Sequence, residues 1–289
     1  MQSARDAIFS AFDTETTGLD PQKGHIVEIA GVRFTGQGGE ISRFATLANP
    51  GVAISPQVTQ IHGINDHMVS RAPDSGHACR QFTSWLGGDD ILLAHNAAFD
   101  TAFIGSALAA RSLPAPRNPV VDTLKCMKYM AECVPGFRRP PNFRLGTLVD
   151  YFGLPETGYH RAMADSLHVM GLFMRFLETM EQLRGPLAPA ELFAIGGVPS
   201  IADVRSGRLN GHARFAHISA IIERGEIITL RCDGSARPGG RRVMPLQLAA
   251  AADGIDYLLA QCMDDGAVKE FRLDRIIEIL PGSHDDRRR

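Results

Sequence analysis

The sequence has no hydrophobic run long enough for a membrane helix and no paired cysteine motif. A membrane-spanning helix needs roughly 20 consecutive apolar residues, and the first residues also lack the apolar segment and cleavage site of a secretory signal. The five cysteines are scattered and form no CxxC motif. This pattern fits reduced thiols in a cytosol and gives no sign of a structural zinc site. We therefore expect a soluble, cytoplasmic protein with reduced thiols and no membrane contact.

A strong charge of either sign is also missing, because 30 basic residues nearly balance 32 acidic ones. Nothing global indicates nucleic-acid binding, so any contact with phosphates must be local or mediated by metal ions. Hydrophobic residues make up 44% and charged residues 21%, as in ordinary globular proteins. This composition argues against extended disorder and against a coiled coil.

What is present predicts two domains. Short apolar runs rich in β-branched residues, followed by alternating helix and strand patterns, predict a mixed α/β sheet flanked by helices in residues 1–184. The predicted strands are 7–12, 26–34, 41–47, 91–94 and 120–123, and the predicted helices are 97–111, 144–152 and 162–183.

The remainder of the chain has a different character. Residues 185–200 are rich in proline and glycine, which predicts a linker. Short strand-like runs separated by Asp-Gly and Gly-Gly turns then predict a small β barrel or sandwich in residues 201–281. These runs are 227–231, 243–248, 257–262 and 276–280. The last residues, 282–289, are expected to be disordered.

Two acids stand one residue apart in AFDTETTG, residues 11–18. Residues i and i+2 of a strand face the same side, about 6.5 Å apart, so Asp13 and Glu15 converge. Two carboxylates this close repel, and a hard cation such as Mg²⁺ or Mn²⁺ removes the repulsion. The pair alone is equally compatible with a solvated strand end.

Two further acids are predicted to point inward from helices. Asp100 in HNAAFD shares a stripe with Phe103 and Ile104, although an acid in a first helical turn also complements the helix dipole. Asp165 in HRAMADS heads the apolar face of the 162–183 helix. His160, five residues earlier, could reach the same site or be a surface residue.

Together these residues supply four carboxylates and one histidine. That set is sufficient for two divalent cations about 4 Å apart, which can bind a phosphodiester, activate water and stabilise the leaving 3′ oxygen. An imidazole suits the removal of a proton from that water.

The three motifs resemble those of the DEDDh exonucleases, the DnaQ-like group of the ribonuclease H-like fold, which includes the proofreading epsilon subunit of bacterial DNA polymerase III. The matching segments are DTETTG at 13–18, HNAAFD at 95–100 and HxAxxD at 160–165. The resemblance implies that Asp13, Glu15, Asp100 and Asp165 bind two Mg²⁺ or Mn²⁺ ions and that His160 is the general base.

The same resemblance implies where the substrate binds. Ile61 to Ile64 is similar to the segment that reaches the terminal nucleotide, and Thr16, Leu19 and Asn96 match positions beside it, while a purely structural role for His62 stays open. Asp122 and Thr123 are interpreted as support for the architecture of the site. Six other histidines match no motif, namely His25, His67, His77, His168, His212 and His217.

The second domain resembles a WYL domain, a small SH3-like β module. The matching segments are 242–246, 257–259 and 271–276, but Asp256 stands where the name motif has tryptophan. Arg242, Arg272 and Arg275 could contact the phosphates of a nucleic acid or a ligand, or could be surface residues of a packing module.

The sequence therefore predicts a metal-dependent 3′–5′ exonuclease that acts on single-stranded 3′ ends, of DNA in preference to RNA, with replication or repair proteins as possible partners. An RNA-trimming exoribonuclease is the alternative within enzymes, because the same chemistry serves both polymers. A non-catalytic nucleic-acid-binding regulator is the alternative from another class.

Overall fold

The computed structural model describes residues 3–155, 160–205, 218, 221–222, 225–233, 240–250 and 256–281. The chain divides into two compact units, Met1–Leu209 and Asn210–Arg289. Within the described residues, no helix combines the length and the apolar character that a membrane span requires.

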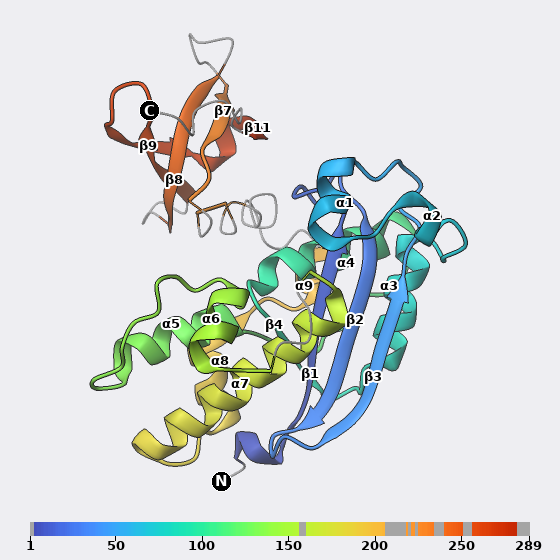
Figure 1. Cartoon of the computed structure of the whole chain (residues 1–289), viewed down its shortest axis with the longest axis vertical. Helices are drawn as coiled ribbons and strands as arrows, with labels where there is room; N and C mark the ends of the chain where they lie inside the picture. Colours follow the sequence, from blue (N-terminus) through green and yellow to red (C-terminus); the bar gives the residue numbers. More distant parts are fainter. Residues whose placement is uncertain are drawn as a thin grey trace. The chain divides into compact units, whose positions relative to one another are not determined.

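A six-stranded mixed sheet organises the first unit, in the order β3-β2-β1-β4-β5-β6 (Figure 1). Strands β1, β2 and β3 form the predicted antiparallel meander, β4 and β5 run parallel to β1, and β6 is antiparallel to β5. The strands are β1 (Ile8–Thr16), β2 (Ile26–Thr35), β3 (Glu40–Leu47), β4 (Ile91–Ala94), β5 (Val120–Asp122) and β6 (Gly197–Val198). The predicted mixed α/β sheet flanked by helices is confirmed.

Helices cover both faces of this sheet. One face packs against a core that includes α5 (Thr123–Cys133), α6 (Leu145–Phe152), α7 (Ala162–Arg184) and α8 (Pro189–Gly196). The other face packs against α3 (Ser75–Trp85), α4 (Ala97–Ala110) and α9 (Ile201–Arg205). Shorter helices complete the unit, namely η1 (Ala4–Asp6), α1 (Pro56–His62) and α2 (Asp66–Val69).

The predicted linker at residues 185–200 differs from the structure. Pro189 begins α8, and Gly197 and Val198 form β6, which pairs with Val121 and Val120 at the sheet edge. A Cβ atom on Gly196 would lie 2.7 Å from Sγ of Cys126 and 2.8 Å from Cγ1 of Val121. Glycine is therefore required here by close packing, and the segment belongs to the first unit.

The second unit contains a five-stranded antiparallel sheet in the order β10-β9-β8-β7-β11. Its elements are β7 (Ile228–Cys232), β8 (Arg241–Ala250), β9 (Asp256–Cys262), β10 (Val268–Arg272), η3 (Leu273–Arg275) and β11 (Ile276–Pro281). The sequence prediction missed β10, whose five residues include three charged side chains. Residues 282–289, predicted to be a disordered tail, lie outside the described part of the chain.

Candidate active site

Strand alternation places Asp13 and Glu15 on the face of β1 that packs against α7. Phe9 and Ala11 have the same parity, and both lie in the core that contains Phe173 of α7. Asp13 and Glu15 continue this row at the carboxyl end of β1, beyond the core, and both side chains are half-buried. The two acids therefore point toward the start of α7.

The first turn of α7 supplies the third acid, Asp165. One ligand oxygen from each of Asp13, Glu15 and Asp165 lies within 4.8 Å of the others. Nδ1 of His168 lies 3.4 Å from Oδ1 of Asp165. Three converging carboxylate oxygens are the donor set that hard divalent cations such as Mg²⁺ prefer, so the residues present fit a metal ion.

Asp100 approaches the same strand from the opposite face. It lies in the first turn of α4, where its Oδ1 accepts hydrogen bonds from the backbone N–H of Thr14 (3.0 Å) and from its hydroxyl (2.7 Å). Asp100 is almost fully buried, and its charge acts directly on Asp13. Three of the four predicted acids thus lie in one cluster. The fourth, Asp100, is hydrogen-bonded to Thr14, which lies between Asp13 and Glu15 on β1.

Burial raises the pKa of all four acids. Burial, and then the charge of Asp100, hold the pKa of Asp13 well above its ordinary range. Burial also raises the pKa of Glu15 to about 8 and that of Asp100 to about 7. The pKa of Asp165 is raised by burial, against the opposing influence of His168. These four groups resist ionisation unless a positive charge joins them.

These shifts predict that the metal-free protein loses stability as the pH rises. A carboxyl whose pKa is higher in the folded chain than in the unfolded chain contributes stability below its unfolded pKa, near 4, and loses it as the pH rises through the folded value, about 8 for Glu15. We therefore expect the Tm in EDTA to be lower at pH 8 than at pH 5.

Saturating Mg²⁺ should reverse this loss. At 100 times its Kd, a ligand that binds only the folded state stabilises it by about 2.7 kcal/mol, so the Tm should rise by several degrees at pH 8 and by much less at pH 5. Thermal unfolding in EDTA and in Mg²⁺ at both pH values measures this. An equal metal response at the two pH values would contradict a cation bound by these acids.

His160 lies just before α7 and takes the left-handed backbone conformation, with φ at 58°. Its side chain is exposed, while its backbone N–H donates a hydrogen bond to the carboxylate of Asp165. The structure therefore brings His160 to the acidic cluster, as the motif spacing predicted.

An ion pair missed by the sequence analysis fixes the residues that follow His160. Oε2 of Glu28 accepts hydrogen bonds from Nε of Arg161 and from the backbone N–H of Ala162, both at 3.0 Å, and Oε1 accepts one from Nη2 of Arg161 at 2.7 Å. Glu28 lies on β2 directly opposite Glu15. Its signal in the sequence was a single acid inside the apolar run IVEIAGV.

The predicted substrate-binding residues surround the carboxyl ends of β1 and β4. The hydroxyl of Thr16 donates to the Gly18 carbonyl (2.6 Å), and Leu19, the next residue, is exposed. Asn96 is the N-cap of α4, with φ at 67°. The imidazole of His62 is buried, which lowers its pKa, and it lies beside the backbone of Thr16.

Asp122 organises this edge of the sheet. Its Oδ1 accepts hydrogen bonds from the backbone N–H groups of Asn96 and Leu124, each at 2.9 Å. Asp122 therefore ties the end of β5 to the start of α4 and caps α5. This matches its interpretation as a support for the site.

The arginines predicted to bind phosphates in the second unit lie on different elements of its sheet. Arg242 is on β8, and Arg272 ends β10. Arg275, in η3, lies 3.7 Å from a carboxylate oxygen of Asp233.

The first unit has the architecture of a nuclease with clustered carboxylates at the carboxyl edge of a mixed sheet. The family model described as "Exonuclease" matches residues 10–173, and the model described as "WYL domain" matches residues 214–280. The first match covers more than half of the chain, so the chain belongs to this exonuclease family. The predicted resemblance to a DnaQ-like exonuclease with a C-terminal WYL domain is confirmed.

The similar curated proteins are much longer polymerases. The chain is 39% identical over 159 residues to DNA polymerase III PolC-type of Oceanobacillus iheyensis and 37% identical over 175 residues to that of Bacillus subtilis. These matches cover 55% and 60% of this chain but only 10% and 12% of the relatives. The chain thus spans about a tenth of the length of these relatives.

Among solved structures, Exonuclease I of E. coli in complex with a dT13 oligonucleotide is similar with a TM-score of 0.59. The match covers 96% of this chain and 66% of that one at 15% sequence identity. Cell-death related nuclease 4 is similar with a TM-score of 0.52 at 16% identity, over 64% of this chain and 67% of that one. Identities this low establish the fold alone.

Proposed function

We propose that the chain is a 3′–5′ exonuclease that requires divalent metal ions and releases nucleoside 5′-monophosphates from single-stranded DNA. The observation that carries this proposal is the cluster of Asp13, Glu15 and Asp165, three acids within 4.8 Å of one another in a partly buried site. Membership of the exonuclease family supports the reaction class.

In this proposal Asp13, Glu15 and Asp165 hold two Mg²⁺ or Mn²⁺ ions, with Asp100 at the opposite side of β1. When bound, such ions lower the pKa of a water molecule and stabilise charge on the leaving oxygen. The imidazole of His160 removes the proton from the attacking water. The bond between phosphorus and the 3′ oxygen breaks, which leaves a 5′-monophosphate and a strand shortened by one nucleotide.

The remaining site residues position the strand end. Thr16, Leu19, His62 and Asn96 would contact the terminal nucleotide, since they gather around the ends of β1 and β4. Glu28 would hold Arg161 and Ala162 and so keep the preceding residue, His160, beside the acids. A carboxylate bonded to both a guanidinium and a helix N–H is suited to this task.

The relatives support DNA as the polymer. The similar curated proteins are DNA polymerases, and the Exonuclease I structure contains a deoxythymidine oligonucleotide. These similarities also support action beside replication or repair proteins in the cytoplasm, where the five free cysteines would stay reduced.

Matched DNA and RNA 20-mers, each labelled at the 5′ end, test the choice of polymer. We expect the DNA strand to shorten from its 3′ end in Mn²⁺ at least about tenfold faster than RNA, a ratio that one 2′-OH-sensitive contact can supply. Faster shortening of RNA would instead favour an exoribonuclease. A duplex with blunt ends serves as the control for single-strand preference.

We also propose that the second unit is an SH3-like WYL module that binds nucleic acid or a ligand. Its support is the WYL match together with the five-stranded antiparallel sheet that carries Arg242 and Arg272. Asp256, which begins β9, replaces the tryptophan of the name motif. The pocket of this module would therefore differ from that of other WYL domains.

A further inference from the structure

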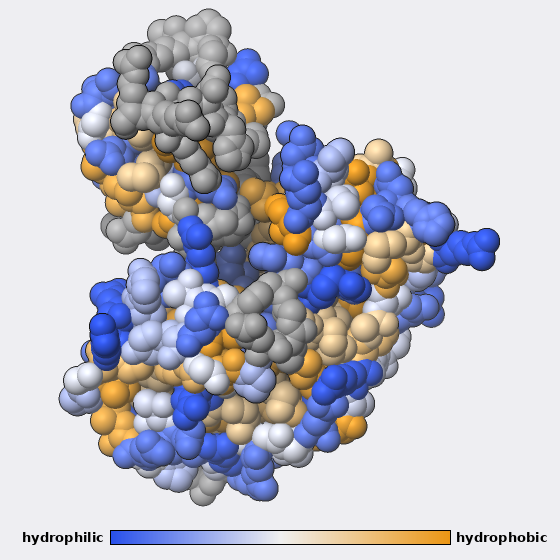
Figure 2. All heavy atoms as spheres, viewed as in Figure 1, coloured by the Kyte–Doolittle hydropathy of each residue, from blue (hydrophilic) through white to orange (hydrophobic). Residues whose placement is uncertain are grey.

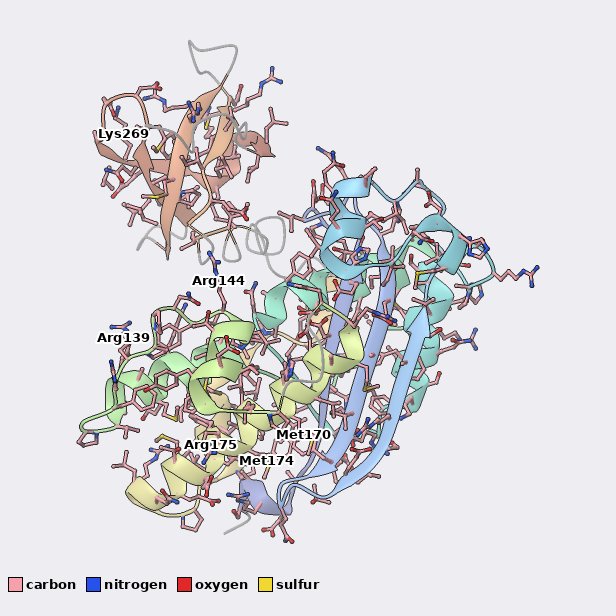
Figure 3. All side chains as sticks on the ribbon, viewed as in Figure 1. Arg139, Arg144, Met170, Met174, Arg175 and Lys269 are labelled. Atoms are coloured by element: carbon pink, nitrogen blue, oxygen red, sulfur yellow. The ribbon has the colours of Figure 1, made fainter. Side chains whose placement is uncertain are left out.

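The segment between α5 and α6 concentrates positive charge. Residues 134–144 contain Arg138, Arg139 and Arg144 and no acid. All three arginines are exposed, and Figure 3 labels Arg139 and Arg144 along the outer margin of the first unit. Figure 2, viewed from the same side, shows hydrophilic residues over this margin. In a chain with a net charge of −2, this segment, residues 134–144, is a local basic loop.

The basic loop is fastened to the core at two points. The hydroxyl of Tyr151 in α6 donates to the carbonyl of Arg138. The half-buried imidazole of His95 donates from Nε2 to the carbonyl of Phe143 at 2.8 Å, while its Nδ1 lies 3.0 Å from the hydroxyl of Thr123. The guanidinium of Arg139 lies over the ring of Phe143, 5.6 Å from its centroid. These contacts hold the backbone and leave the arginine heads exposed.

His95 links the basic loop to the active-site edge of the sheet. It follows β4 directly and precedes Asn96, the N-cap of α4, whose first turn contains Asp100. The ends of β4 and β1 are paired neighbours, and β1 carries Asp13 and Glu15 while β4 leads into α4 with Asp100. The fixed end of the basic loop, at Phe143, thus lies at the same edge of the sheet as the acids of β1.

Charge determines what such a loop can bind. The acidic cluster repels a polyanion, so a strand needs positive groups beyond the acids to be held. Guanidinium groups bind phosphates through paired N–H donors and stack on aromatic rings. We propose that Arg138 and Arg139 of the basic loop bind backbone phosphates of the single-stranded substrate on the 5′ side of the bond that is cleaved. This rests on the proposed exonuclease function.

The test uses the full chain and two substrates. One is a 5′-fluorescein-labelled 12-mer of deoxythymidine, and the other is the chromogenic mononucleotide ester thymidine 5′-(4-nitrophenyl phosphate). The ester reaches the acidic cluster but has no upstream phosphates. Arg138→Ala/Arg139→Ala should reduce the ratio of kcat/KM for the 12-mer to kcat/KM for the ester by about tenfold, the loss expected for a charge-assisted hydrogen bond. Arg80→Glu on α3 changes the net charge by the same two units on the opposite face of the sheet and should leave this ratio unchanged.

Salt dependence gives a second readout that needs no turnover. Each phosphate contact with a single strand contributes about 0.7 to the slope of log K against log salt. Fluorescence anisotropy of the 12-mer in EDTA should therefore show a slope about 1.4 smaller for the double variant.

The inference is overturned by a ratio within twofold of wild type, by an unchanged slope, or by an equal loss in Arg80→Glu. If the wild-type chain cleaves neither substrate in Mg²⁺ or Mn²⁺, the proposed exonuclease function fails, while the slope still tests the basic loop. If the wild-type chain cleaves both and the ratio is unchanged, only the basic loop is excluded.

Discussion

Asp13→Asn should lower Mg²⁺-dependent hydrolysis of a single strand by at least about 10³-fold. The substitution keeps the shape of the side chain and removes one of three clustered charges that would hold the metal. Metal coordination supplies several kcal/mol of charge stabilisation in phosphoryl hydrolysis, and each 1.36 kcal/mol is about tenfold in rate. Initial rates on a 5′-labelled DNA strand measure the loss.

The stability of the same variant should move in the opposite direction. Asp13 is buried among acids that repel its charge, so asparagine should raise the Tm in EDTA while weakening the response to Mg²⁺. Asp89→Asn is the matched control, because Asp89 is exposed and lies before β4 at the opposite end of that strand from Asp100. Hydrolysis retained by Asp13→Asn would exclude this cluster as the metal site.

His160→Asn should slow hydrolysis by about 10² to 10⁴-fold, the usual contribution of a general base. Asparagine tolerates the left-handed conformation that His160 adopts, so the start of α7 should keep its geometry while the base is lost. We expect the loss of rate to lie in kcat, with little change in KM. Single-turnover rates at a saturating concentration of the DNA strand distinguish a change in kcat from a change in KM.

His67→Ala provides the comparison for His160, because His67 is exposed on α2 and matches no motif. It should retain wild-type rates. If His160→Asn cleaved DNA at the wild-type rate, another group would have to accept the proton from water.

Much of the site could be predicted because its acids lie on regular elements. The alternation of β1 predicted that Asp13 and Glu15 converge, and the helical stripe predicted that Asp165 points inward. The structure adds that Asp100 reaches β1 from the other face, through Thr14. That detail depends on how α4 packs on the sheet, which periodicity does not specify.

Other features depended on contacts between distant segments. Glu28 and Arg161 are separated by 133 residues, and neither matched a motif. The prediction of a linker at residues 185–200 was wrong for a different reason. Its prolines and glycines were interpreted as residues that interrupt helices and strands. Pro189 instead starts α8, and Gly196 allows close approach of Cys126. Composition alone could not distinguish flexibility from tight packing.

The identity of the first product tests the central claim most directly. A single-stranded DNA labelled on its 3′-terminal nucleotide and, separately, at its 5′ end would be incubated with the wild-type chain in Mg²⁺. We predict that the 3′ label appears at once as a nucleoside 5′-monophosphate while the 5′ label remains on strands shortened stepwise, and that EDTA stops both. Early release of the 5′ label, or of nucleoside 3′-monophosphates, would contradict a metal-dependent 3′–5′ exonuclease.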